Sequence, residues 1–107
     1  MKVVGVCACT AGIAHTYMAR EHILEAAKQR GDSCFIETQG TIGPEYVLTD
    51  EQIAEADVVL LAVDVAISGE ERFAGKPTVR VGTAKVIKDS RGILDKIQEL
   101  LDKKNAN

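Results

Sequence analysis

An unbroken apolar run at residues 58–63, Val-Val-Leu-Leu-Ala-Val, is the feature that most constrains the fold. A strand with one solvated face alternates apolar and polar residues, whereas a strand covered by protein on both faces is apolar at every position. A second run of this kind, Val-Val-Gly-Val-Cys-Ala, occupies residues 3–8. We therefore predict central strands at residues 3–8 and 57–63, in a parallel sheet with helices on both faces.

Three segments carry the signals of helices. Residues 15–30 have an apolar face at i, i+4, i+7 and i+8, and Gly31 follows, a residue common just past a helix end. Thr49 and Gln52 match a capping box, which predicts a short helix after Thr49. The clearest amphipathic segment lies near the C-terminus, and its apolar positions are Ile93, Leu94, Ile97, Leu100 and Leu101.

The remaining segments complete an α/β domain. Residues 33–38 are rich in β-forming types, and residues 76–81 alternate a charged residue with valines, as an edge strand does. Residues 39–44 are expected to form a loop, and residues 68–75 a loop with one helical turn. Together these elements predict one domain spanning the whole chain, a three-layer αβα sandwich. Its four-stranded, mainly parallel sheet has the order 2-1-3-4, with helices on both faces.

Charge and hydropathy exclude some classes of function. The formal net charge of −3 comes without a basic stripe, which argues against nucleic acid as a partner. No apolar run reaches the roughly 18 residues that a membrane-spanning helix needs. The N-terminus lacks the pattern of a secretory signal, so we expect a cytoplasmic protein.

Three cysteines make an odd count, and structural disulfides are not expected in a reducing compartment. Cys7 lies inside a predicted central strand, and we expect it and Cys34 to be buried core residues. Cys9 is different because it lies at the exit of the strand, where α/β sheets place their ligand sites. A Cys7–Cys9 redox or metal pair is an open but poorer alternative, since redox pairs favour Cys-x-x-Cys and zinc needs more ligands.

Cys9 opens a strand-to-helix turn. The first N–H groups of a helix lack partners within it and carry partial positive charge, so they attract anions. The small residues Ala11, Gly12 and Ala14 let an anion approach the backbone closely. The same field favours a thiolate at Cys9. A thiolate beside an anion cradle is suited to phosphoryl chemistry on sulfur.

The residue six positions after Cys9 is His15. A cysteine-dependent phosphatase needs an arginine there, because a bidentate guanidinium grips the phosphoryl oxygens in the transition state. We therefore interpret the turn as part of a phosphoryl carrier rather than a phosphatase. His15 either donates a hydrogen bond to the thiolate or phosphoryl group, or caps and packs at the helix start. Thr16 either adds a hydroxyl to the cradle or caps the helix, and His22 is expected at the surface.

The turn resembles the phosphorylation loop of the fructose-type enzyme IIB proteins of the bacterial sugar phosphotransferase system, whose usual run is Cys-Pro-Thr-Gly-Ile-Ala-His-Thr. Here it reads Cys9-Thr10-Ala11-Gly12-Ile13-Ala14-His15-Thr16. Further matches cover nearly the whole chain: Tyr17-Met18-Ala19, Glu37-Thr38-Gln39-Gly40, Leu48-Thr49, Ala56-Asp57-Val58-Val59, Asp64 and Glu71-Arg72-Phe73-Ala74-Gly75-Lys76-Pro77. Thr10 and Ala11 depart from the usual proline and threonine.

The resemblance implies a function and a set of site residues. Cys9 becomes the phosphocysteine, which accepts a phosphoryl group from a phosphohistidine of the IIA component and passes it to fructose or a related sugar at the membrane IIC component. His15 becomes a possible hydrogen-bond donor. The phosphoryl-binding residues become Thr10, Ala11, Gly12, Ile13, Ala14 and Thr16. No metal or cofactor is implied, and we expect a monomer that associates with the inner face of the membrane through IIC.

Two other functions remain open at this stage, a low-molecular-weight phosphatase-like enzyme and a regulatory phosphoryl acceptor. Around the turn, we expect Asp64 to hold backbone rather than touch substrate, and Gln39 and Gly40 to form a neighbouring wall. Residues 71–73 are either a docking patch, or a core plug at Phe73 beside a local ion pair of Arg72. The identity of the sugar is not encoded in the chain as we interpret it.

Overall fold

The computed structural model describes residues 1–10 and 13–105. The elements are, in chain order, β1 (Lys2–Ala8), α1 (Ile13–Arg30), β2 (Ser33–Gly40), β3 (Gly43–Glu45), α2 (Asp50–Glu55), β4 (Val58–Val63), the 3-10 helix η1 (Glu70–Phe73), β5 (Thr78–Val81) and α3 (Thr83–Asn105). The strands and helices alternate as predicted, which confirms the α/β class.

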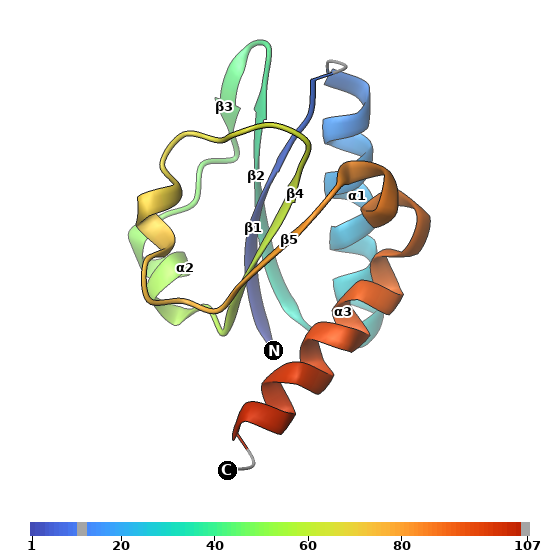
Figure 1. Ribbon diagram of the computed structural model, residues 1–107, viewed down its shortest axis with the longest axis vertical. Coiled ribbons are helices and arrows are strands. Elements are labelled where there is room, and N and C mark those ends of the chain that lie inside the picture. The colour runs from blue at the N-terminus through green and yellow to red at the C-terminus, as the bar shows by residue number, and fades with distance from the viewer. Residues whose placement is uncertain (11–12, 106–107) are drawn as a thin grey trace.

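The sheet has the order β3-β2-β1-β4-β5, with β1 at its centre (Figure 1). Strands β2, β1, β4 and β5 are parallel, in the predicted order. The sheet has five strands rather than the expected four, because part of the segment expected to be a loop forms β3, antiparallel to β2. Gly43 has a φ of 94°, which lets the chain reverse there. Pro44 is compatible with a strand because β3 lies at the edge of the sheet.

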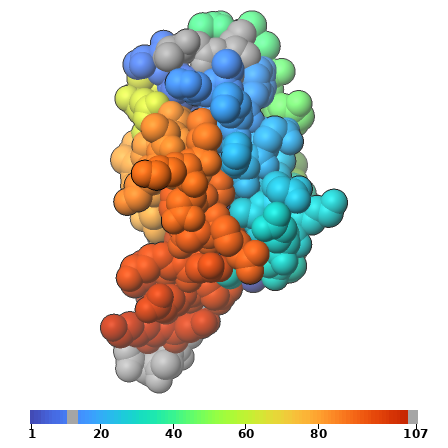
Figure 2. Space-filling view, turned by 90° about the vertical axis from the view of Figure 1, so that its right-hand side faces the viewer, coloured from blue at the N-terminus to red at the C-terminus, as the bar shows by residue number. Residues whose placement is uncertain are grey.

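Helices cover both faces of the sheet. Helices α1 and α3 lie on one face, and α2 and η1 on the other (Figure 1). Figure 2 shows α1 and α3 side by side, with the last turns of α3 extending past the rest of the molecule. The capping box of α2 is confirmed: the Thr49 hydroxyl accepts from the backbone N–H of Gln52, and the Gln52 side chain accepts from the N–H of Thr49.

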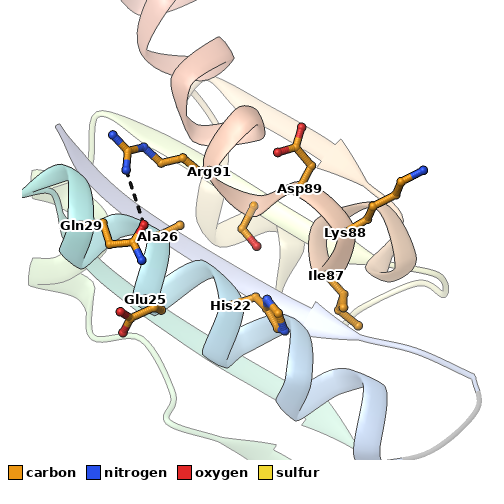
Figure 3. A pocket seen from close by; sticks show the side chains of 9 residues that line it. His22, Glu25, Ala26, Gln29, Ile87, Lys88, Asp89 and Arg91 are labelled. Atoms are coloured by element: carbon orange, nitrogen blue, oxygen red, sulfur yellow. Dashed lines mark hydrogen bonds between the residues drawn. The ribbon is translucent and has the colours of Figure 1, made fainter.

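Helix α3 is longer than predicted and is kinked. Its second half contains the amphipathic segment found in the sequence, but the helix begins at Thr83. Asp89 has non-helical dihedrals, φ −150° and ψ 56°, so the two halves meet at an angle there (Figure 3). The Asp89 carboxylate accepts a hydrogen bond of 3.1 Å from the N–H of Gly92, as an N-cap does for a new helix. The prediction missed the first half because the cap interrupts the apolar spacing.

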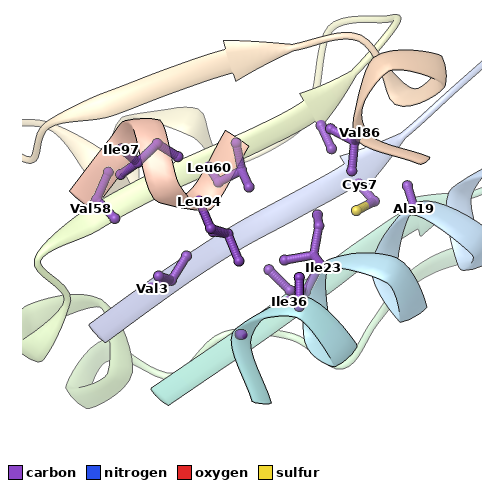
Figure 4. Close-up of a cluster of buried hydrophobic side chains, with 13 residues drawn as sticks. Val3, Cys7, Ala19, Ile23, Ile36, Val58, Leu60, Val86, Leu94 and Ile97 are labelled. Atoms are coloured by element: carbon purple, nitrogen blue, oxygen red, sulfur yellow. The ribbon is translucent and has the colours of Figure 1, made fainter. Parts of the chain in front are cut away.

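The core lies in two layers, one on each side of the sheet. Along β1, Val3 and Cys7 face α1 and α3, whereas Val4 and Val6 face α2. Figure 4 shows the first layer, where Leu94 of α3 meets residues of α1, β1 and β4. Because β1 and β4 are covered on both sides, every position of these strands is buried from Val3 or Val58 onward. The uninterrupted apolar runs are explained by this double burial.

Candidate functional site

Cys9 lies directly after β1, at the carboxyl end of the central strand, and is partly buried. Thr16 is in the first turns of α1 and only 1% of it is exposed. Its hydroxyl donates a hydrogen bond of 3.3 Å to the Sγ of Cys9. The sulfur is therefore held beside the N-terminal turns of α1, as the sequence predicted. The Thr16 hydroxyl bonds to the thiol. This favours the interpretation in which Thr16 belongs to the site over the one in which it caps the helix.

The other predicted phosphoryl-binding residues are only partly placed. Ala11 and Gly12 lie outside the described residues, and the side chain of Ile13 is not described. Thr10 is exposed, and so are Ala14 and His15 in the first turn of α1. Because His15 is exposed, it does not pack in the core, and its donation to a phosphoryl group stays a prediction.

The three thiols occupy different environments. Cys7 is buried in the layer under α1, and burial raises the pKa of its thiol to about 12, with a smaller opposing effect from Arg20. Burial likewise raises the pKa of Cys34 to about 12, with a further increase from Asp32, although this residue is only partly buried rather than fully so. Cys7 and Cys34 are thus protonated at neutral pH. Within residues 1–10 and 13–105, no three His, Cys, Asp or Glu side chains gather as a metal site.

Asp64 connects the carboxyl end of β4 to two neighbours of the site. Its backbone N–H donates to the carbonyl of Ala8, the residue before Cys9, over 2.9 Å. Its carboxylate accepts hydrogen bonds from the N–H of Thr83 at 3.0 Å and from the Thr83 hydroxyl at 2.5 Å. Asp64 therefore caps α3, which confirms that it holds backbone. Thr83 was not predicted as its partner, because the two residues are brought together only by the fold.

A buried carboxylate that was not predicted from the sequence lies under the α2 face of the sheet. Glu37 of β2 is almost fully buried and accepts two hydrogen bonds from the guanidinium of Arg72, at 2.8 and 3.1 Å. Burial by itself would raise the pKa of Glu37. The hydrogen bonds from Arg72, from the Gln39 amide and from the N–H of Leu48 outweigh it, and they hold the pKa below the ordinary value.

This ion pair resolves the two interpretations of residues 71–73. Phe73 is 3% exposed and packs in the layer under α2, and Arg72 pairs with Glu37. Phe73 is therefore a core plug, and Arg72 pairs with an acid as expected, although this acid lies on β2, far from Arg72 in the sequence. The sequence does show a charged residue, Glu37, inside a β-forming segment, but no pattern of neighbouring residues indicated that Arg72 is its partner.

A shallow pocket of about 280 Å³ lies between α1 and α3 at the Asp89 kink (Figure 3). Residues from α1 and from both sides of the kink line it, and His22 lies at its rim. His22 is exposed, as predicted for a surface residue. The lining mixes acidic and basic side chains, so the pocket offers no single charge to a ligand.

No helix in the described part of the chain has the length and hydropathy to span a membrane. The described residues combine a mainly parallel α/β sheet, a cysteine at the exit of its central strand and a helix that begins at Ile13. Proteins of this class bind ligands at such a topological switch point of the sheet.

Comparisons with known proteins identify the family within this class. The family model described as "PTS system, Lactose/Cellobiose specific IIB subunit" matches residues 4–96. The "PTS system fructose-like EIIB component 2" of Escherichia coli K12 is 48% identical over 97 residues, which cover 91% of this chain and 92% of that protein. The "PTS system fructose-specific EIIB'BC component" of Xanthomonas campestris is 41% identical over 89% of this chain and 16% of its own length.

Solved structures agree. The Enzyme IIB subunit of the PTS system from Escherichia coli K12 superposes with a TM-score of 0.91 at 36% identity, covering 97% of this chain and 96% of that one. A domain of the fructose-specific IIABC component from Borrelia burgdorferi has a TM-score of 0.83 at 47% identity, covering 88% and 89%. The chain belongs to the IIB family of the sugar phosphotransferase system and is of the fructose type, so it is a phosphotransferase component.

Proposed function

We propose that this chain carries a phosphoryl group on the Sγ of Cys9. In the first step, the thiolate attacks the phosphorus of a phosphohistidine on the IIA component. The S–P bond forms as the N–P bond breaks, and the histidine, which takes a proton from water or a neighbouring acid on its ring, leaves as a neutral imidazole. In the second step, a sugar hydroxyl attacks the phosphocysteine at the IIC component. The O–P bond forms, the S–P bond breaks and returns the thiolate, and the hydroxyl proton passes to a base or water.

The observation that carries the proposal is the hydrogen bond from Thr16 to the Cys9 sulfur at the start of α1. A hydroxyl donor and the positive end of a helix both stabilise negative charge on sulfur and on an attached phosphoryl group. Cys7 and Cys34 are unsuited to this role because burial keeps them protonated. Of the three cysteines, Cys9 is therefore the one whose surroundings suit a nucleophilic thiolate.

The rest of the site supports a carrier rather than a hydrolase. The residue six positions after Cys9 is the exposed His15, which cannot make the planar fork of an arginine. We propose that His15 and the backbone of the turn from Thr10 to Thr16 contact the phosphoryl oxygens. Without an arginine to stabilise the transition state of hydrolysis, a phosphoryl group held in this way is not driven to react with water.

The names of the relatives support the proposed partners. The Xanthomonas and Escherichia proteins named "EIIB'BC" carry B and C components in one chain, which supports a IIC partner for this domain. The donor is then a IIA protein or domain, and the work takes place on the cytoplasmic side of the membrane. The relatives' names favour fructose or a related sugar, whereas the family model's description names lactose and cellobiose.

The experiment is phosphorylation with phosphoenolpyruvate, the general phosphotransferase proteins and a fructose-type IIA, followed by intact mass at neutral pH. The unmutated chain and Cys34→Ser are expected to gain one phosphoryl group, and Cys9→Ser none. Membranes containing IIC should remove the group on adding fructose and not on adding lactose or cellobiose. A phosphoryl group that persists in Cys9→Ser, or no gain in the unmutated chain, would disprove the carrier.

A further inference from the structure

The segment from Asp64 to Gly69, here called the strap, runs from the end of β4 across the carboxyl end of β1 to β2. At its first residue, the N–H of Asp64 donates to the carbonyl of Ala8, next to Cys9. At its other end, Ser68 bonds to the side chain of Gln39 on β2. Since β1 lies between β4 and β2, the strap passes the exit of the strand that carries Cys9 (Figure 1).

The Gln39 amide holds the strap by two hydrogen bonds to one backbone unit. Its Oε1 accepts from the N–H of Ser68 at 2.8 Å, and its Nε2 donates to the carbonyl of Ser68 at 2.9 Å. The side chain thereby pairs with the Ser68 backbone as a neighbouring β-strand would. The same Nε2 also donates to the Glu37 carboxylate at 2.8 Å, which fixes the amide orientation.

The arrangement is rigid because each of its supports is itself fixed. Glu37 is buried and paired with Arg72, whose Nε donates to the carbonyl of Gly69 at 2.6 Å. Val65 and Ile67 pack against the core layer under α2, while the alternate residues of the strap are exposed. The exposed side of the strap is therefore supported from below, beside the site.

We propose that Gln39 is a positioning residue for phosphoryl transfer, which acts by holding the strap as one wall of the Cys9 site. This inference rests on the proposed carrier function and extends it. Gln39 does not touch the reacting atoms. It determines where the backbone of residues 65–68 stands when the phosphohistidine of the donor protein approaches Cys9. A loosened wall misaligns the in-line attack, and small misplacements of this kind are costly.

The test compares Gln39→Met with Gln98→Met, a glutamine of α3 whose side chain also makes hydrogen bonds. Methionine matches glutamine in length and lacks both hydrogen-bonding groups. We expect Gln39→Met to lower kcat for phosphorylation by IIA by roughly tenfold or more, with a smaller change in KM, and Gln98→Met to leave both unchanged. Iodoacetamide should alkylate Cys9 in Gln39→Met at the unmutated rate, since this small reagent needs no alignment by the strap.

Amide hydrogen exchange at Ser68 reports the strap directly and should be faster in Gln39→Met alone. Gln39→Glu is the second variant: it keeps an acceptor for the Ser68 N–H, but it loses the donor and places a second carboxylate beside Glu37, so its kcat should also fall. Unchanged kcat in Gln39→Met, whether or not exchange at Ser68 becomes faster, would overturn the inference and leave the carrier function standing. No phosphorylation of the unmutated chain would overturn both.

Discussion

Thr16 of α1 donates a hydrogen bond of 3.3 Å to the sulfur of Cys9, which lies directly after β1. Thr16 is buried, so its hydroxyl has no competing water. The bond links the start of α1 to the exit of β1. It therefore couples the position of the thiol to the start of the helix.

Replacing Thr16 with valine keeps the shape of the side chain and removes this donor. A hydrogen bond to a charged group is typically worth about 1.5–3 kcal/mol, so Thr16→Val should slow phosphorylation of Cys9 by roughly ten- to a hundredfold. Thr16→Ser keeps the hydroxyl and should retain most of the rate. The measurement is the initial rate of phosphoryl transfer from phosphorylated IIA. Equal rates in the valine and serine variants would mean that the hydroxyl plays no part.

Thiol alkylation should discriminate sharply among the three cysteines. Burial raises the pKa of Cys7 and Cys34 to about 12, so at pH 7.5 their thiolate fraction is on the order of 10⁻⁴ or less. We expect iodoacetamide to modify the native protein once, at Cys9, and to modify all three cysteines after unfolding in urea. Peptide mapping locates the label. A native protein labelled first at Cys34 would contradict the protonated state assigned to it.

The Glu37–Arg72 pair should make stability depend on pH. The pKa of Glu37 in the folded protein lies below the value of about 4.3 expected when the chain is unfolded. Its carboxylate therefore stabilises the folded state above about pH 4.3, and this contribution is lost as the pH falls through the folded-state pKa. Glu37→Gln should lower the free energy of unfolding at pH 7 by about 3 kcal/mol, because it leaves Arg72 without its partner charge.

The difference between Glu37→Gln and the unmutated protein should shrink when urea unfolding is repeated near pH 3. Glu70→Gln is the matched control, because Glu70 pairs with Arg80 and both side chains are 49% exposed. Exposed ion pairs contribute little to the free energy of unfolding, so this variant should unfold almost as the unmutated protein does at both pH values. A Glu37→Gln deficit of the same size at both pH values would show that packing, not charge, is responsible.

Removing the cap that Asp64 provides for α3 should lower the stability of the folded protein. Asp64→Ala leaves the N–H and hydroxyl of Thr83 without their acceptor, and loss of a helix cap typically costs about 1 kcal/mol. Asp64→Asn keeps one acceptor oxygen and should cost less. Thermal unfolding of the two variants beside the unmutated chain measures the difference. If asparagine proved as destabilising as alanine, the charge of Asp64 and not its hydrogen bonds would be the cause.

Elements with strong local signals were predicted closely. The expected strand at residues 33–38 became Ser33–Gly40, and the helix expected at 15–30 became Ile13–Arg30. The boundaries move by only a residue or two where apolar spacing and a terminal glycine agree. Strand β3 was missed because two glycines and a proline normally break regular structure, and only its neighbour β2 makes this segment a strand.

The sequence by itself determined the double burial of β1 and β4, the placement of Cys9 at the exit of the central strand and the resemblance of the turn to a phosphorylation loop. These depend on residues close together in the chain. The tertiary structure alone decided the burial of Glu37, its pairing with Arg72 and the cap that Asp64 makes for α3. Glu37 and Arg72 are 35 residues apart in sequence. A polar side chain finds such a partner only after the sheet has brought separate strands together, and no local pattern records it.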